Sequence, residues 1–188
     1  MRNSVLFLTF ASLSLGSLAL PVAAQAQSTT STKEFAVIGN VPAMCSGGTL
    51  VGDGTFDVGV LTDTTTGLLR ADLAAPNKVL AGSFCSTRST INIVATPMTA
   101  QSFTAAAPDG FSRTVHYTAT AAGWTATAAS YDTAATSNSA ATQTRTTAFT
   151  GDIVVGVSNF ATGGGQALRL VADPTYRGLI SVTLSVAD

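Results

Sequence analysis

Apolar and polar residues alternate with period two along most of this chain, and this periodicity constrains its fold more than any other feature. Such alternation is typical of β-strands with one buried face. The last run is the clearest, with an apolar face formed by Ile180, Val182, Leu184 and Val186. Other runs lie at residues 35–41, 56–60, 79–84, 91–95, 115–117, 124–126, 153–157 and 168–170.

Turn-forming residues separate these runs, among them Asp53-Gly54, Pro108-Asp109-Gly110 and Asp173-Pro174. No later window has a convincing helical stripe, although residues 66–74 have the pattern of one or two helical turns. Residues 128–147 are rich in Ala, Ser and Thr, and we expect a long surface loop with at most a poor strand there. Short strands divided by turns predict an all-β sandwich.

The first 26 residues have the pattern of a secretory signal peptide. Arg2 supplies the positive charge, Val5–Leu20 the apolar region, and Ala24-Gln25-Ala26 the small residues of a cleavage site. We therefore expect an exported protein in which residues 27–188 form a single domain. No later segment is apolar enough to span a membrane, so no transmembrane anchor is expected after cleavage.

Charge and cysteine content narrow the class of protein further. The 9 basic and 10 acidic residues leave a formal net charge of −1, which provides no basic face for nucleic acid. In an oxidising compartment an even cysteine count predicts one disulfide, between Cys45 and Cys85. The alternative is a pair of reactive or metal-binding thiols, but the chain has no CxxC motif and one histidine.

Catalytic motifs are nearly absent. His116 is the single histidine and lies in an alternating run, and there is no G-x-S-x-G sequence. The aspartates are scattered in turn-like contexts, and Gly163–Gly165 lacks the lysine of a phosphate-binding loop. Trp124 is a candidate platform for a sugar ring, although its strand-like context favours the core. We therefore expect no enzyme, no cofactor and no metal site.

The order of features along the chain resembles a known family. A strand precedes Cys45, a Gly54–Gly59 box follows it, Cys85 closes another strand, and Tyr176–Val186 ends the chain. These features are similar to those of chaperone–usher pilins, especially the spore coat protein U type that includes archaic pilus subunits. In that family the box is Gly-x-Leu-x-Phe-Gly and the end is Tyr-x-Asp-x-apolar-x-Val-x-Val. Gly178 stands at the aspartate position.

The resemblance implies an immunoglobulin-like β-sandwich that lacks its last strand. In such proteins a periplasmic chaperone lends a strand to the open groove, and an outer-membrane usher assembles the fibre. The N-terminal strand of the next subunit then replaces the chaperone strand. A head-to-tail interface of this kind does not close on itself, so it propagates a filament at the cell surface. The implied partners are a chaperone, an usher and further subunits, with a homopolymer expected and cell adhesion as its role.

Carried onto this chain, the resemblance makes residues 27–44 the N-terminal donor segment. Its inward face comprises Phe35, Val37, Gly39 and Val41. The acceptor groove includes the C-terminal face formed by Ile180, Val182, Leu184 and Val186. The alternative is a self-complete secreted sandwich in which residues 35–41 pair within their own chain, and which coats the cell surface or binds glycans.

Overall fold

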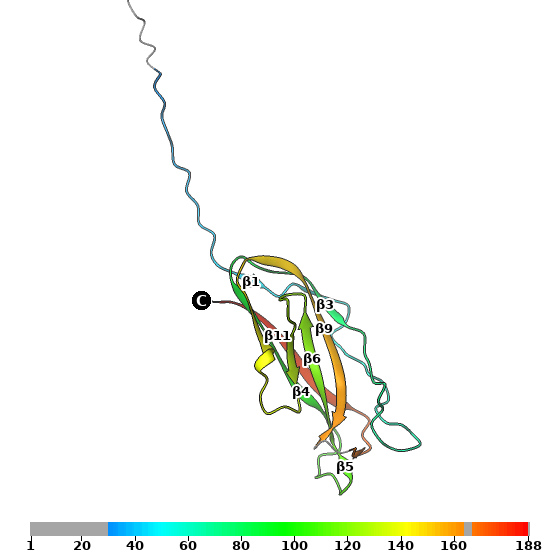
Figure 1. Ribbon diagram of the computed structural model, residues 1–188. Coiled ribbons are helices and arrows are strands. Elements are labelled where there is room, and N and C mark those ends of the chain that lie inside the picture. Colours follow the sequence, from blue (N-terminus) through cyan, green and yellow to red (C-terminus); the bar gives the residue numbers. More distant parts are fainter. Residues whose placement is uncertain (1–29, 164–166, 188) are drawn as a thin grey trace, which may run out of the picture. The chain divides into compact units, whose positions relative to one another are not determined.

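The computed structural model describes residues 30–163 and 167–187, and it is nearly all β (Figure 1). The chain divides into two units, one ending at Gly39 and the other beginning at Asn40. Residues 30–44 contain no helix and no strand. All strands of the described residues belong to the second unit. The predicted signal peptide, residues 1–26, lies outside the described residues.

The strands of the second unit are mostly short, with four long ones that carry the fold. The elements are β1 (Cys45–Ser46), β2 (Thr49–Val51), β3 (Lys78–Cys85), β4 (Ser89–Ala100), β5 (Phe111–Ser112), β6 (Thr114–Ala122), β7 (Ala129–Asp132), a 3₁₀ turn (Ser139–Ala141), β8 (Thr142–Arg145), β9 (Phe149–Thr162), β10 (Arg169–Leu170) and β11 (Tyr176–Val186).

Nine strands form one curled antiparallel sheet. Six of them follow one another in the order β1-β3-β9-β6-β4-β11, and the other three pair with strands of this path. In addition, β2 pairs with β3, β7 with β6, and β8 with β4, while β5 and β10 form a separate parallel pair. The joint between β6 and β4 is only two residue pairs long, Met98–Val115 and Thr99–Thr114. Beyond that joint the two strands diverge, because β6 pairs with β7 and β4 with β8. The diverging halves enclose the core.

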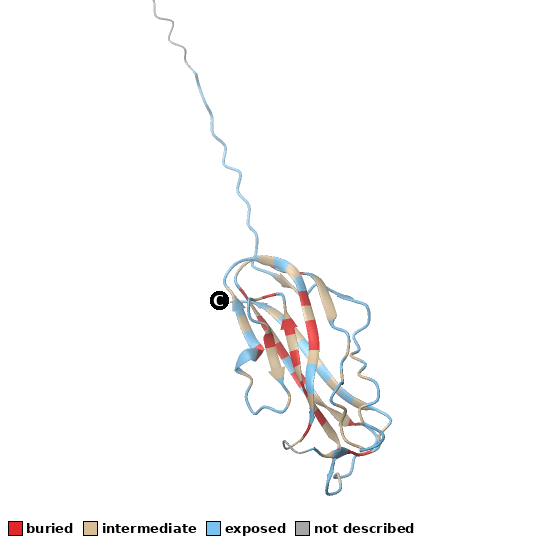
Figure 2. Cartoon of the chain, turned by 45° about the vertical axis from the view of Figure 1, so that its right-hand side comes forward, coloured by how far each residue is buried: buried red, intermediate tan, exposed pale blue. Residues whose placement is uncertain are grey.

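The core follows the period-two pattern of the sequence, and the buried residues lie along the strands (Figure 2). Ile91, Ile93, Val115 and Ile153 are fully buried from three strands, which are β4, β6 and β9. Trp124 is also 0% exposed, and its indole Nε1 donates to Ser89 Oγ at 3.3 Å. Its burial confirms the core interpretation and excludes the alternative of an exposed sugar platform.

Several local predictions are wrong. Residues 56–60 and 124–126 form no strand, although both alternate. Residues 66–74 form turns and two isolated bridges, Thr62–Leu69 and Leu68–Arg169, instead of a helix. The predicted loop at 128–147 contains β7, the 3₁₀ turn and β8, because its small Ala and Thr side chains pack beside β6 and β4. Small residues gave these strands no hydrophobic signal.

Cys45 and Cys85 form a disulfide, as predicted. The bond joins β1 to the end of β3, where the two cysteines also face each other in the β-ladder. It closes a loop between positions 40 residues apart. The start of the second unit is thereby covalently attached to a central strand.

Within the described ranges, no helix has the length and apolar character needed to cross a bilayer.

Candidate functional site

A groove of about 500 Å³ lies along the first half of β11. One wall is β11 itself, and the other is formed by β2, the following segment and the start of β3. The lining residues are Leu50, Gly54, Thr55, Phe56, Val58, Lys78, Leu80, Met98, Tyr117, Val155, Val157, Phe160, Tyr176, Arg177, Gly178, Leu179, Ile180 and Val182. Most of these side chains are apolar, so the groove favours an apolar occupant.

The β11 wall combines an apolar face with a free backbone edge. In the described chain β11 pairs with β4 alone, from Tyr176 to Val186. Its second edge therefore carries no ladder, and such an edge is a template for another strand. Ile180 and Val182 are half-buried and packed against the core. A strand added at this edge would complete their burial.

The opposite wall is held by a lysine at its rim. Lys78, at the start of β3, forms an ion pair with Asp53 and lies 5.9 Å from the centre of the Phe56 ring. The ammonium group lowers the pKa of the Asp53 carboxyl by hydrogen bonding and charge. These contacts attach the irregular segment after β2 to the sheet, and they place Phe56 in the groove.

The floor of the groove is aromatic, with Tyr117 buried and Phe160 half-buried. The rings of Tyr117 and Phe160 lie 6.1 Å apart, on β6 and β9. Burial raises the pKa of Tyr117 to about 12. The Tyr117 hydroxyl donates to the Leu179 carbonyl oxygen at 3.3 Å, so the floor is tied to the β11 wall. An occupant would meet a preformed apolar surface.

Gly178 lies at an irregularity in the pairing of β11 with β4, between Arg177 and Leu179. A Cβ atom at this position would come within 2.7 Å of the Thr96 carbonyl oxygen and 3.1 Å of the Tyr117 hydroxyl oxygen. Backbone leaves no space for a side chain here. A side chain at position 178 would therefore require the neighbouring backbone to move.

Replacing Gly178 by aspartate is expected to destabilise the fold. Overpacking alone typically costs about 1–3 kcal/mol, and the carboxylate would face a carbonyl oxygen. Urea denaturation would measure the loss. Ser181→Asp, on the exposed face of the same strand, is the matched control and is expected to change stability little. Equal losses in both variants would contradict this account of Gly178.

The predicted acceptor residues separate along β11. Ile180 and Val182 line the groove. Leu184 packs against the core outside the groove lining, and Val186 is partly exposed at the end of the strand. The groove instead extends to the other end of β11, where Tyr176 lines it. The hydroxyl of Tyr176 donates to the Val171 carbonyl oxygen at 2.8 Å.

The predicted donor residues carry exposed apolar side chains. Phe35, Val37 and Val41 are 87%, 98% and 81% exposed, and none of them lies in a strand. Gly39 interrupts their face without a side chain. This is a large apolar exposure for a segment of so few residues.

Sequence reasoning missed most of the groove. The floor residues Met98, Tyr117 and Phe160 come from three different strands, and only long-range pairing brings them together. Phe56 belongs to the Gly54–Gly59 sequence motif, but nothing in that motif predicts the contact between Phe56 and Lys78. His116 lies outside the groove, with Nδ1 3.0 Å from the Thr133 carbonyl oxygen, which is a structural role.

Comparison with known proteins gives no match, whether to a family model, to a curated protein or to a solved structure.

Proposed function

We propose that this chain is a structural subunit of a bacterial surface pilus or fibre. Its fold is an immunoglobulin-like sandwich that lacks one strand, and residues 33–41 of a second copy supply that strand. Subunits joined in this way form a head-to-tail fibre, with a homopolymer as the simplest case. A periplasmic chaperone would occupy the groove before assembly and an outer-membrane usher would guide it, so the protein would be exported to the cell surface.

One observation carries the proposal: an unpaired β11 edge above an apolar groove occurs in a chain that also exposes an alternating apolar segment. The two match in length. Residues 176–182 line the groove and residues 35–41 form the segment, and each spans roughly 20 Å when extended. Burying Phe35 and two valines would contribute roughly 5–7 kcal/mol, beside the main-chain hydrogen bonds of the added strand.

The alternative of a self-complete sandwich requires residues 35–41 to pair within their own chain. These residues form no strand in the structure. The alternative also includes glycan binding, for which Trp124 was the candidate stacking residue. Trp124 is buried and cannot stack on a sugar ring. Both observations favour the fibre subunit.

Deletion of residues 27–41 tests the proposal. All strands begin after this segment, so we expect the shortened protein to fold and to stay monomeric. Adding a synthetic peptide of residues 31–43 is expected to raise its thermal midpoint by mass action. A peptide with Phe35→Asp and Val37→Asp is the control and is expected to have no effect. A deletion that unfolds the protein would show that the segment belongs to its own core.

A further inference from the structure

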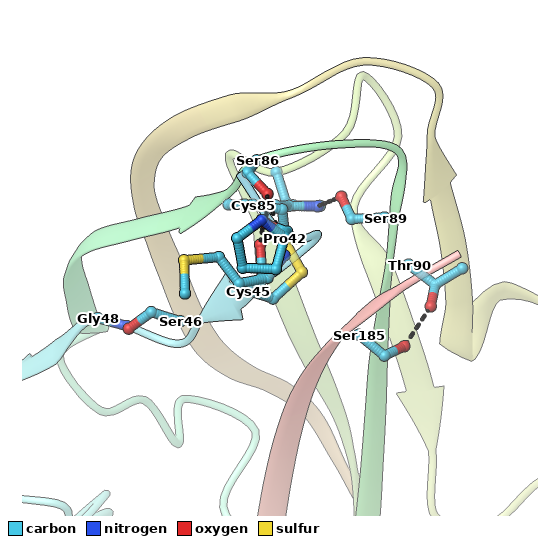
Figure 3. The surroundings of a disulfide bond; sticks show 11 residues. Pro42, Cys45, Ser46, Gly48, Cys85, Ser86, Ser89, Thr90 and Ser185 are labelled. Atoms are coloured by element: carbon cyan, nitrogen blue, oxygen red, sulfur yellow. Dashed lines mark hydrogen bonds between the residues drawn. A yellow bond between two sulfur atoms is a disulfide. The ribbon is translucent and has the colours of Figure 1, made fainter. Parts of the chain in front are cut away.

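The N-terminal segment is anchored to the domain at one serine. The Met44 amide donates to Ser86 Oγ at 2.9 Å, and the Ser86 amide donates to the Met44 carbonyl oxygen at 2.9 Å. The Ser86 hydroxyl also lies 3.4 Å from the carbonyl oxygens of Pro42 and Met44, either of which is within reach as an acceptor. The Cys45–Cys85 disulfide lies directly beside these contacts (Figure 3). Residues 42–45 are therefore held at the end of β3.

The register of the sheet shows on which side of the groove residues 42–45 are anchored. β1 runs antiparallel to β3, with Cys45 opposite Cys85 and Ser46 opposite Phe84. Following the chain forward from Cys45 therefore leads along β3 toward Leu80 and Lys78, which line the groove. Residues 42–44 lie at the other end of β3, beside Ser86. The anchor is thus at the end of β3 away from the groove.

Chain length then decides whether the segment can reach its own groove. The groove residue Leu80 lies six positions before Ser86 in the sequence, a span of roughly 20 Å along an extended strand. A chain that turned back at Pro42 would need about six extended residues to cover that span. These would be residues 36–41, so Phe35 would be the one donor side chain of the apolar face left to enter the near end of the groove, preceded by the polar residues 27–34. The apolar part of the anchored segment is therefore too short to fill the groove of its own domain.

We propose that Ser86 and the disulfide together prevent self-insertion and make residues 33–41 a donor for other copies only. Ser86 is a positioning residue in this scheme, because it sets where the segment leaves the domain without contacting the occupant of the groove. The inference rests on the proposed function, since it assumes that the segment binds a groove.

A spacer tests the length argument. A flexible Gly/Ser linker of about 12 residues between Val41 and Pro42 is long enough for the segment to turn back and cover the span. We expect this full-length variant to be a monomer whose thermal midpoint is higher than that of the wild type and independent of protein concentration. The same linker between Thr32 and Lys33 is the control. It leaves the anchor unchanged, so concentration-dependent assembly is expected to persist.

Ser86→Ala tests the serine separately. Without the hydroxyl, the Ser86 amide still binds the Met44 carbonyl oxygen, but the contacts of the hydroxyl with Pro42 and the Met44 amide are lost. About two more residues then become available to return toward the groove. Hydrogen exchange of the β11 amides in dilute protein is the readout, because donation from other copies is then negligible. We expect greater protection of β11 in Ser86→Ala than in the wild type. Ser137→Ala, at an exposed serine between β7 and the 3₁₀ turn, is expected to leave protection unchanged.

Two results would overturn the inference, and they differ in meaning. If the dilute wild-type chain already protects β11, and Phe35→Asp removes that protection, the segment fills its own groove despite the anchor. The groove and its occupant would then stand, and only the direction would be wrong. If neither the spacer variant nor the added peptide of residues 31–43 protects β11, the segment does not bind the groove, and the proposed function fails as well.

Discussion

A chain carrying Phe35→Asp and Val37→Asp is expected to fold normally and to lose assembly. Both side chains are almost fully exposed in the single chain, so their replacement costs the domain little. In the proposed fibre both enter an apolar groove, and each contributes about 1.5–3 kcal/mol there. Losing both, and burying two carboxylates instead, is expected to weaken association by more than about a thousandfold. Sedimentation velocity across a concentration series would measure this.

The matched control places the same charges at neighbouring positions. Ala36 and Ile38 have the opposite parity in an extended strand, so their side chains would point out of the groove. Ala36→Asp with Ile38→Asp is expected to keep assembly within about tenfold of the wild type, although Ile38 is as apolar as Val37. Equal effects of the two pairs would mean that the segment does not bind as a strand.

Removing the disulfide is expected to have the largest effect on the stability of the domain. Replacing Cys45 and Cys85 by alanine releases a loop with a sequence separation of 40 residues. On the chain-entropy estimate this costs about 4 kcal/mol. For a domain of this size the thermal midpoint is expected to fall by about 10 °C. Differential scanning calorimetry would measure the change.

Reduction of the wild-type protein is the companion measurement. A reducing agent is expected to lower the midpoint of the wild type to that of the double variant, and to leave the double variant unchanged. The contrary result would be a wild type whose midpoint does not change on reduction, beside a destabilised double variant. The loss of stability in the variant would then come from packing around the cysteines, because Cys85 is buried in the core.

Much of the fold follows from the alternation of apolar and polar residues with period two. The runs at 79–84, 91–95, 115–117, 153–157 and 180–186 all lie in strands, because each buries one face. Residues 56–60 alternate as well, yet they form no strand. The Phe56 side chain is partly buried by Lys78 and the other groove residues, and its backbone pairs with no strand. Alternation alone does not distinguish this arrangement from a β-strand.

The candidate site was less accessible to sequence reasoning than the fold. Ile180 and Val182 were identifiable because they lie in one alternating run. The groove brings together residues of β2, β3, β4, β6, β9 and β11, and a local residue pattern does not encode such long-range pairing. Leu184 has the same pattern as Val182, but it packs against the core outside the groove lining.

The curled sheet also has a mechanical consequence for the proposed fibre. Tension would enter each subunit at Cys45, where the disulfide passes it covalently to β3, and would leave through the strand bound beside β11. Between β3 and β11 the load crosses the ladders of β9, β6 and β4 in turn. The shortest of these ladders is the two-residue joint between β6 and β4. A stretched subunit is therefore expected to yield first at Met98–Thr99, while the covalently fixed end of β3 holds.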